Sequence, residues 1–156
     1  GRVRVRGPER PRATDLKTLP YPGFPTDLQS PFMALLSLAE GTSVITETIF
    51  ENRFKVAGEL CRMGAQVIVD GRVAVVKGVP SLSGATVEAM DDLRGGAALV
   101  LAGLAAQGVT VVEGARHIQR GYDRLHLKLR AVGADIVYRS GSGSAWTAQP
   151  TTSAVS

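Results

Sequence analysis

The sequence predicts an α/β fold in which one structural unit occurs twice. Apolar segments with helical spacing alternate along the chain with short runs of valine, isoleucine and threonine, which are typical of strands. Marker residues recur in the two halves: Asp27-Leu28 with Asp92-Leu93, Gly41 with Gly108, Arg53 with Arg120, and Gly64-Ala65 with Gly133-Ala134. Because helices, strands and an arginine follow in the same order in each half, we interpret the chain as a duplicated α/β unit.

The predicted elements follow from periodicity and from the residues that break it. Prolines exclude helix from the first part of the chain, and Asp70-Gly71 is typical of a two-residue hairpin turn. In chain order we predict an extended lead-in at 1–26, a helix at 27–40, a strand at 42–45, a helix at 54–63, a hairpin at 66–78, an extended segment at 81–90, a helix at 92–108, a strand at 109–114, a helix at 120–133, a strand at 134–138 and a flexible tail at 140–156.

These elements are grouped into one partial domain. The lead-in at 1–26 is assigned to the same domain as residues 27–139. Within it the repeats are expected at about 27–65 and 92–134, with the hairpin between them. The tail is expected to be flexible because it is rich in serine, glycine and threonine and lacks periodicity.

The composition favours a globular protein with anionic small-molecule ligands. The chain has 156 residues, 44% of them hydrophobic, and a formal net charge of +4. Nucleic acid is disfavoured as a partner, because aromatic residues are only 5% and no nucleic-acid-binding motif is present. Arginines suit phosphates and carboxylates. With neither a long apolar run nor an export signal, we expect a cytoplasmic protein that does not contact a membrane.

Three arginines lie where the chain enters or leaves a predicted helix. Arg94 falls in the first turn of the helix at 92–108, where free backbone N–H groups attract anions. Arg120 is expected to open the helix at 120–133 in the same way, and Arg53 is its counterpart in the first half. A guanidinium at a helix N-terminus suits a phosphate or a carboxylate, whereas pairing with surface carboxylates is the alternative.

Asp27 is the candidate carboxylate, because the preceding segment "YPGFPT" contains two prolines that fix its position. Either Thr26 or Asp27 could cap the helix at 27–40, and this role is favoured by the sequence alone. The alternative for Asp27 is a general base that faces the arginines. Glu47, Glu51 and Asn52 could orient such a site or form a charged loop rim.

Neither a metal nor another cofactor is expected. The single Cys61 excludes a cluster of several cysteines, and its helical context "AGELCRMGA" favours a buried hydrophobic role. His117 and His126 have no second ligand at metal-binding spacing. We interpret both histidines as structural or surface residues.

The chain resembles the C-terminal part of the UDP-N-acetylglucosamine enolpyruvyl transferases, or 1-carboxyvinyltransferases, in seven segments: "PYPGFPTDLQ", "GTSVITETIFENRF", "ELCRMGA", "LSGA", "DLRGGAALVLAGLAAQG", "HIQRGYDRL" and "KLRAVGADI". The segments occur in consistent order from about Val3 to about Val137. The resemblance implies the family's inside-out α/β barrel fold, whose two domains contain three α/β units each. This chain would hold about two of the three units of one domain.

The resemblance also implies a reaction and roles for individual residues. Members of the family transfer the enolpyruvyl group of phosphoenolpyruvate to the 3-hydroxyl of UDP-N-acetylglucosamine and release phosphate, the first committed step of peptidoglycan synthesis in bacteria. Asp27 matches an aspartate that takes the hydroxyl proton and holds the UDP-sugar, which Ile49 also contacts. Arg94 and Arg120 match arginines that bind the phosphoenolpyruvate anion, with Arg120 the stronger candidate, and Arg53 matches another active-site arginine.

Two alternatives stay open. A related transferase that acts on shikimate 3-phosphate shares the fold and the phosphoenolpyruvate chemistry, although "ETIFENRF" and "RGYDRL" argue against it. A non-catalytic relic would keep the arginines without the rest of the site. The family's lysine-asparagine pair and its reactive cysteine belong to an N-terminal half that this sequence lacks. We therefore expect that half as a partner, and no turnover by the chain alone.

Overall fold

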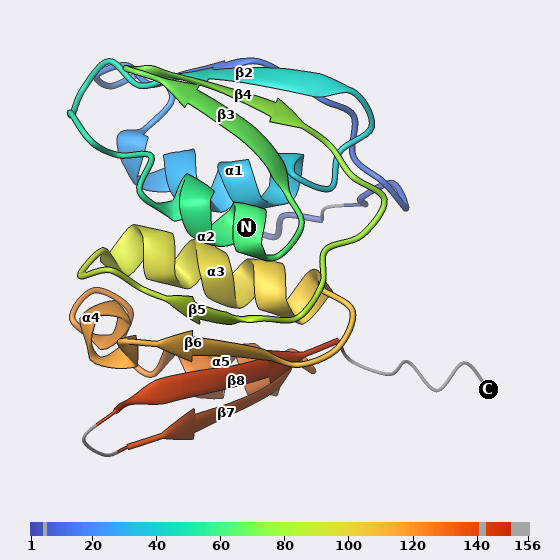
Figure 1. Cartoon of the computed structure of the whole chain (residues 1–156), viewed down its shortest axis with the longest axis vertical. Coiled ribbons are helices and arrows are strands. Elements are labelled where there is room, and N and C mark those ends of the chain that lie inside the picture. Colours follow the sequence, from blue (N-terminus) through green and yellow to red (C-terminus); the bar gives the residue numbers. More distant parts are fainter. Residues whose placement is uncertain (5, 141–142, 151–156) are drawn as a thin grey trace.

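The computed structural model of the chain describes residues 1–4, 6–140 and 143–150. Two four-stranded sheets lie at opposite ends of the molecule, and helices α1, α2 and α3 lie between them (Figure 1). The first unit contains β1 (Leu16–Lys17), a 3-10 helix η1 (Thr26–Leu28), α1 (Gln29–Leu36), β2 (Thr42–Thr46), α2 (Val56–Arg62), β3 (Gln66–Asp70) and β4 (Val73–Lys77). The second contains β5 (Thr86–Glu88), α3 (Leu93–Ala105), β6 (Thr110–Glu113), α4 (Ala115–Gln119), α5 (Leu125–Ala131), β7 (Asp135–Arg139) and β8 (Ala145–Gln149).

The two sheets have the same topology. The strand orders are β1-β2-β4-β3 and β5-β6-β8-β7, and in each sheet the first pair is parallel and the other pairs are antiparallel. The registers also correspond, because Leu16 pairs with Ile45 and Val87 pairs with Val112. The predicted α/β fold and its internal duplication are therefore confirmed.

The repeating unit is longer than predicted. The hairpin β3–β4 belongs to the first unit, since β4 pairs with both β2 and β3. It does not lie between repeats at 27–65 and 92–134. The lead-in at 1–26 supplies β1, and the extended segment at 81–90 supplies β5. Each unit is thus a βαβαββ arrangement, and the hairpin is needed to complete its sheet.

The prediction of a flexible tail at 140–156 is wrong for residues 145–149. They form β8, which pairs with β6 and with β7 and so lies inside the second sheet. Trp146 and Ala148 are fully buried and alternate with half-buried neighbours, the period expected of a strand. Serine and glycine before this segment masked the strand pattern. The rest of the predicted tail at 141–142 and 151–156 lies outside the described residues.

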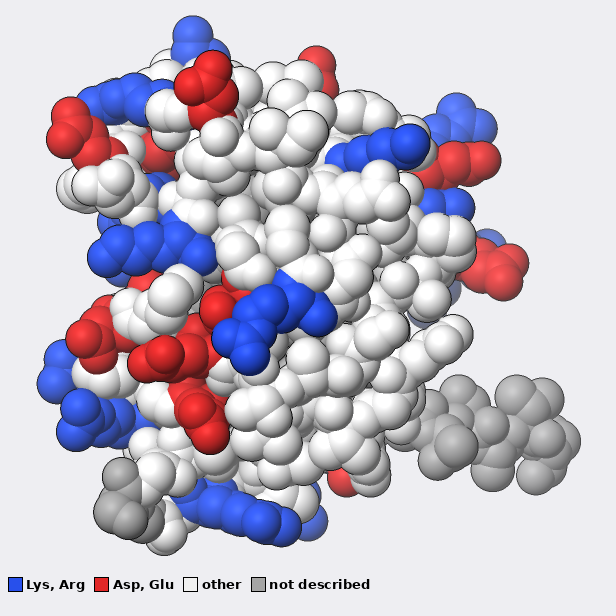
Figure 2. Space-filling view, in the orientation of Figure 1, with Lys and Arg blue, Asp and Glu red and all other residues white. Residues whose placement is uncertain are grey.

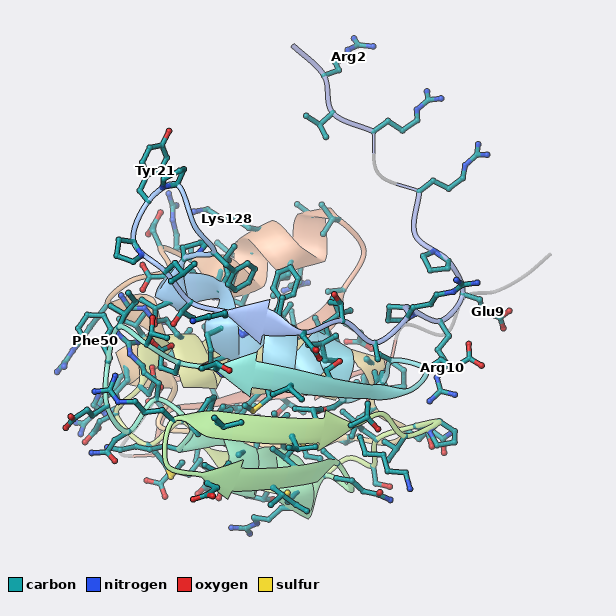
Figure 3. The ribbon with its side chains drawn as sticks, turned by 90° about the horizontal axis from the view of Figure 1, so that it is seen from above. Arg2, Glu9, Arg10, Tyr21, Phe50 and Lys128 are labelled. Atoms are coloured by element: carbon teal, nitrogen blue, oxygen red, sulfur yellow. The ribbon has the colours of Figure 1, made fainter. Side chains whose placement is uncertain are left out.

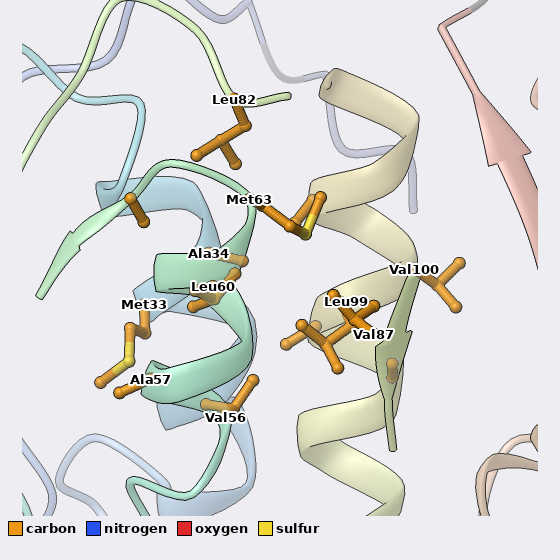
Figure 4. Packing of buried hydrophobic residues seen from close by; sticks show 14 of the residues in the cluster. Met33, Ala34, Val56, Ala57, Leu60, Met63, Leu82, Val87, Leu99 and Val100 are labelled. Carbon is orange, nitrogen blue, oxygen red and sulfur yellow. The ribbon is translucent and has the colours of Figure 1, made fainter. Parts of the chain in front are cut away.

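One core joins the two units. Met63, which directly follows α2, points toward α3, and Leu99 of α3 lies beside Val87 of β5 (Figure 4). α3 is buried along most of its length, as its apolar sequence predicts. Cys61 points outward from α2 and is exposed, which corrects its expected burial. In the described part of the chain, no helix is long and apolar enough to cross a membrane.

Near its start, the lead-in contacts the segment that follows the first helix through one arginine. Arg10 donates hydrogen bonds from Nε to the carbonyl of Leu38 at 2.9 Å and from Nη2 to that of Ala39 at 3.0 Å. A cation suits this position, because backbone carbonyl groups near the C-terminal end of a helix carry partial negative charge. On the other side of Arg10 the chain runs away from the body of the molecule toward Arg2 (Figure 3).

Candidate active site

Asp27 and Arg94 bring the two units together at one charged site. The Nε–H of Arg94 in α3 donates to Oδ1 of Asp27 in η1 at 2.5 Å. The side chain of Asp27 is 61% exposed and that of Arg94 is 28% exposed, so the pair lies at the surface. Acidic and basic side chains gather over this edge of the molecule, near the loop before α3 and near α4 (Figure 2).

This contact corrects the expected cap of the first helix. The residue before α1 is Leu28, and no side chain caps the helix there. Thr26 donates instead to Glu47, at 2.8 Å between Oγ1 and Oε2. Residues 26–28 form a 3-10 turn, so Asp27 is turned toward the second unit and away from the amides of α1.

Arg94 lies in the first turn of a helix, as predicted, but its own backbone amide is occupied. Asp92 caps α3 and accepts the N–H of Arg94 at 3.0 Å. Its Oδ2 would lie 2.9 Å from a Cβ added at Gly95, so that glycine is needed for the cap. An anion at this position would be bound by the guanidinium group of Arg94 rather than by this amide.

Arg120 is placed differently from the prediction. It follows α4, and its backbone N–H donates to the carbonyl of His117. The helix expected at 120–133 begins only at Leu125, because Arg124 has φ 46° and the chain turns before it. Arg120 therefore stands at the C-terminal end of a short helix, not at an N-terminus.

Even so, the chain brings Arg120 close to the start of α3. Gly121 packs so tightly on Leu93 that a Cβ there would lie 2.9 Å from Cδ1 of Leu93. Gly121 directly follows Arg120, and Leu93 directly precedes Arg94. The two arginines assigned to the same anion are thus on neighbouring segments.

Tyr122 is a neighbour of the charged pair that the sequence reasoning did not single out, although "RGYDRL" contains it. Burial raises the pKa of its phenol, the charge of Arg94 lowers it, and the charges of Asp27 and Asp92 raise it, with a net increase. These influences show that the half-buried ring lies near the Asp27–Arg94 pair. No pattern in the sequence distinguishes this tyrosine from a packing residue.

Arg53 is not joined to this pair. Its guanidinium lies over the ring of Phe50, with 4.4 Å between Cζ and the ring centroid, which is a cation–π contact. Among the described residues, no hydrogen bond or ion pair connects Arg53 to Asp27 or Arg94. The contact that the structure gives for Arg53 is thus with Phe50, and its role as an anion-binding residue stays a prediction.

A pocket of about 510 Å³ adjoins Asp27. It is lined by Leu19, Pro20, Tyr21, Pro22, Gly23, Pro25, Thr26, Asp27 and Ile49. Both residues that the resemblance assigns to the UDP-sugar, Asp27 and Ile49, are in this lining. Tyr21 stands at the tip of the proline-rich loop and points away from the body of the molecule (Figure 3).

Glu47 and Glu51 follow the same strand but differ in environment. Glu51 lies on the surface and pairs with Arg72 at 3.1 Å, as a loop rim would. Glu47 is 1% exposed. Burial alone would raise the pKa of Glu47, but hydrogen bonds from the amides of Ile49 and Phe50 and from two threonine hydroxyls outweigh it, so the pKa is lowered.

Comparison with known proteins identifies the family. The family model of EPSP synthase (3-phosphoshikimate 1-carboxyvinyltransferase) matches residues 1–129. The chain belongs to this family. The expected resemblance to enolpyruvyl transferases is confirmed.

Within the EPSP synthase family, curated relatives with high identity share one name. The chain is 64% identical over 134 residues to UDP-N-acetylglucosamine 1-carboxyvinyltransferase 3 of Symbiobacterium thermophilum, a match that covers 86% of this chain and 31% of the relative. It is 60% identical over 136 residues to the UDP-N-acetylglucosamine 1-carboxyvinyltransferase of Anaeromyxobacter sp. strain Fw109-5, covering 87% and 32%. The chain spans about a third of the length of these relatives.

Solved structures of the EPSP synthase family show the same fold. The enolpyruvyl transferase NikO from Streptomyces tendae is similar over 81% of this chain and 29% of its own, with a TM-score of 0.73 and 35% identity. EPSP synthase from Acinetobacter baumannii is similar over 93% of this chain with a TM-score of 0.65 and 21% identity, which supports the fold alone. Among the described residues, no group of acidic, histidine or cysteine side chains is arranged to hold a metal ion.

Proposed function

We propose that this chain forms part of the active site of an enzyme that transfers enolpyruvyl from phosphoenolpyruvate to the 3-hydroxyl of UDP-N-acetylglucosamine and releases phosphate. The observation that carries the proposal is the contact between Asp27 and Arg94, because it joins a guanidinium to a carboxylate that lines the pocket. The 64% identity to a relative named for this reaction supports it. Peptidoglycan synthesis in a bacterial cytoplasm would be the setting.

Each residue has a distinct part in the proposed reaction. Asp27 accepts the proton of the sugar hydroxyl, so that the hydroxyl oxygen can bond to the enolpyruvyl carbon that loses phosphate. Arg94 holds Asp27 through Nε, which leaves its terminal nitrogens to bind the phosphoenolpyruvate anion together with Arg120. Ile49 packs against the sugar nucleotide in the pocket. Arg53, whose guanidinium lies over Phe50, is a further candidate for binding the anion.

The rest of the active site is assigned to a part of the enzyme that this chain does not include. The relatives are about three times as long as the matched region, and no residue here corresponds to the family's lysine-asparagine pair or reactive cysteine. We therefore test turnover in a chimera, in which this chain replaces the matching 134 residues of the Symbiobacterium thermophilum relative. The chimera should release phosphate only with both substrates, whereas the isolated chain should release none.

The substitution that tests the assigned base is Asp27→Asn in the chimera. We expect kcat to fall by about 100-fold or more, because general base catalysis contributes at least that factor. Asp70→Asn is the matched control, since Asp70 is the exposed last residue of β3, beside the hairpin turn and outside the lining of the pocket. The measurement is phosphate release with UDP-N-acetylglucosamine and phosphoenolpyruvate at saturation.

Three outcomes would count against this function. Undiminished turnover by Asp27→Asn would remove Asp27 as the base. A chimera that uses shikimate 3-phosphate in preference to UDP-N-acetylglucosamine would favour the reaction in the family's name. Binding of phosphoenolpyruvate without phosphate release would favour the non-catalytic alternative.

A further inference from the structure

We propose that Glu47 is a positioning residue that holds the wall of the pocket beside Asp27 in place. Its carboxylate accepts four hydrogen bonds: from Oγ1 of Thr18 at 2.8 Å, Oγ1 of Thr26 at 2.8 Å, the amide of Ile49 at 2.8 Å and the amide of Phe50 at 3.1 Å. This assignment rests on the proposed function, because it concerns how the same pocket is shaped.

The donors come from three separate segments that form the pocket. Thr18 follows β1 and precedes Leu19, which lines the pocket. Thr26 lines the pocket itself and directly precedes Asp27. Ile49 lines it from the loop after β2. One carboxylate therefore connects the proline-rich loop, the turn that carries Asp27 and the wall opposite.

Its burial indicates a role other than charge pairing. Glu47 is 1% exposed, and within the described residues no lysine or arginine forms an ion pair with it. A buried carboxylate without a cation is costly unless donors satisfy it, and an apolar side chain would fill the space at lower cost. We infer that the carboxylate fixes the relative positions of these segments, because donors from all three bond to the same group.

The second unit shows that the fold itself does not need this carboxylate. Thr46 of β2 and Glu113 of β6 hold corresponding places in the two sheets, because they pair with Lys17 and Glu88. The residue after Glu113 is Gly114, at the position that Glu47 has in the first unit. A βαβαββ unit thus forms with a glycine there, so the carboxylate belongs to the pocket of the first unit rather than to the repeat.

The test compares Glu47→Ala and Glu47→Gln in the chimera. We expect Glu47→Ala to raise the KM for UDP-N-acetylglucosamine by about 10-fold or more, the usual effect of removing a residue that orients others. The KM for phosphoenolpyruvate should change by less than about 2-fold, because Arg94 has no hydrogen bond to Glu47. The KM of Glu47→Gln for UDP-N-acetylglucosamine should lie between those of wild type and Glu47→Ala, since the glutamine side-chain oxygen can still accept some of the four hydrogen bonds.

Glu51→Gln is the matched control, because Glu51 lies on the same loop but pairs with Arg72 at the surface. It should leave both KM values unchanged. Equal rises in both KM values, or no rise with Glu47→Ala, would overturn the assignment, since a residue that only stabilises the fold would not select one substrate. Glu47→Ala and Glu47→Gln are compared well below their unfolding temperatures.

A second measurement separates this inference from the proposed function. In the 156-residue chain, Glu47→Ala should speed amide hydrogen exchange of Ile49 and Phe50 by about 10-fold or more, with the amides of β4 unaffected. An inactive chimera with this exchange pattern would overturn the reaction but keep the positioning role. Unchanged exchange at both amides would overturn the positioning role whatever the chimera does.

Discussion

Asp27 lines the pocket and Glu47 is buried behind its wall, so these two carboxylates have opposite surroundings. Asp27 is 61% exposed and has a single charged partner, Arg94. Glu47 is buried and held by four donors from its own unit. An exposed carboxylate with one partner can exchange that partner for a ligand, whereas a carboxylate with four donors keeps its place. We therefore expect Asp27 to react with the substrate and Glu47 to hold the pocket wall in place.

At this scale we predict how the stability of the chain depends on acid. Hydrogen bonds lower the pKa of Glu47 in the folded chain below its usual value of 4.5. The stability that its charged form contributes is complete above the unfolded-state pKa, and it is lost as the pH falls through the lower folded-state pKa. The free energy of unfolding, measured by urea denaturation at a series of pH values, should fall less below about pH 4.5 in Glu47→Gln than in wild type. Parallel curves for the two proteins would contradict this.

Among the elements, α3 packs tightly on its neighbours because two of its glycines leave no room for a side chain at the contacts. A Cβ at Gly96 would lie 2.7 Å from Cγ1 of Ile118 and 2.9 Å from Cβ of Ala89. A Cβ at Gly103 would lie 2.9 Å from Cβ of Thr110 in β6. The helix that carries Arg94 can therefore lie directly on α4 and β6, and the arginine is placed by this packing.

The same substitution in two helices should have opposite effects. Gly96→Ala should lower the free energy of unfolding by about 1–3 kcal/mol, because the added methyl group overpacks the contact with Ile118 and Ala89. Gly58→Ala in α2 should raise it by up to about 1 kcal/mol, because nothing lies within 4 Å of the added Cβ and alanine favours helix. Urea denaturation of both variants checks this. A higher free energy of unfolding for Gly96→Ala would contradict this and would show that α3 can move to accommodate the methyl group without loss of stability.

For the whole molecule, the two units share one core. α1 and α2 of the first unit pack on α3 of the second, so neither sheet has a core that is closed without the other unit. The second sheet in turn depends on β8, where Trp146 is fully buried against the rings of Tyr138 and His126. A substitution that destabilises one sheet is therefore expected to destabilise the other sheet as well.

We predict that Trp146→Ala destabilises both units together. The loss should be about 3–5 kcal/mol, the usual cost of removing a large buried aromatic side chain. Amide hydrogen exchange should become faster in β2 and β4 as well as in β6 and β8, since unfolding of a shared core is cooperative. Val137→Ala, at a half-exposed position of the neighbouring β7, is the control and should cost far less. Faster exchange confined to the second sheet would show that the units unfold independently.

The sequence was sufficient for the duplication, the fold class and the position of Arg94 in the first turn of α3, because these depend on local periodicity and on residues that begin and end elements. It was misleading for β8, whose serine- and glycine-rich approach resembles a tail although alternate side chains of the strand are buried. It was also misleading for Arg120, because the left-handed Arg124 delays the helix by several residues and no local pattern signals that turn.

By itself, then, the sequence determined which kinds of side chains this protein brings to a site: a carboxylate after a proline-rich loop and arginines near helix ends. Only the tertiary structure decided which of them meet. Asp27 and Arg94 are 67 residues apart and contact each other because α1, which directly follows η1, packs on α3, while Arg53 lies over the ring of Phe50. Glu47 could be recognised as the centre of a pocket wall only once β1, η1 and the loop after β2 were in place, since its four donors come from three separate segments of the chain.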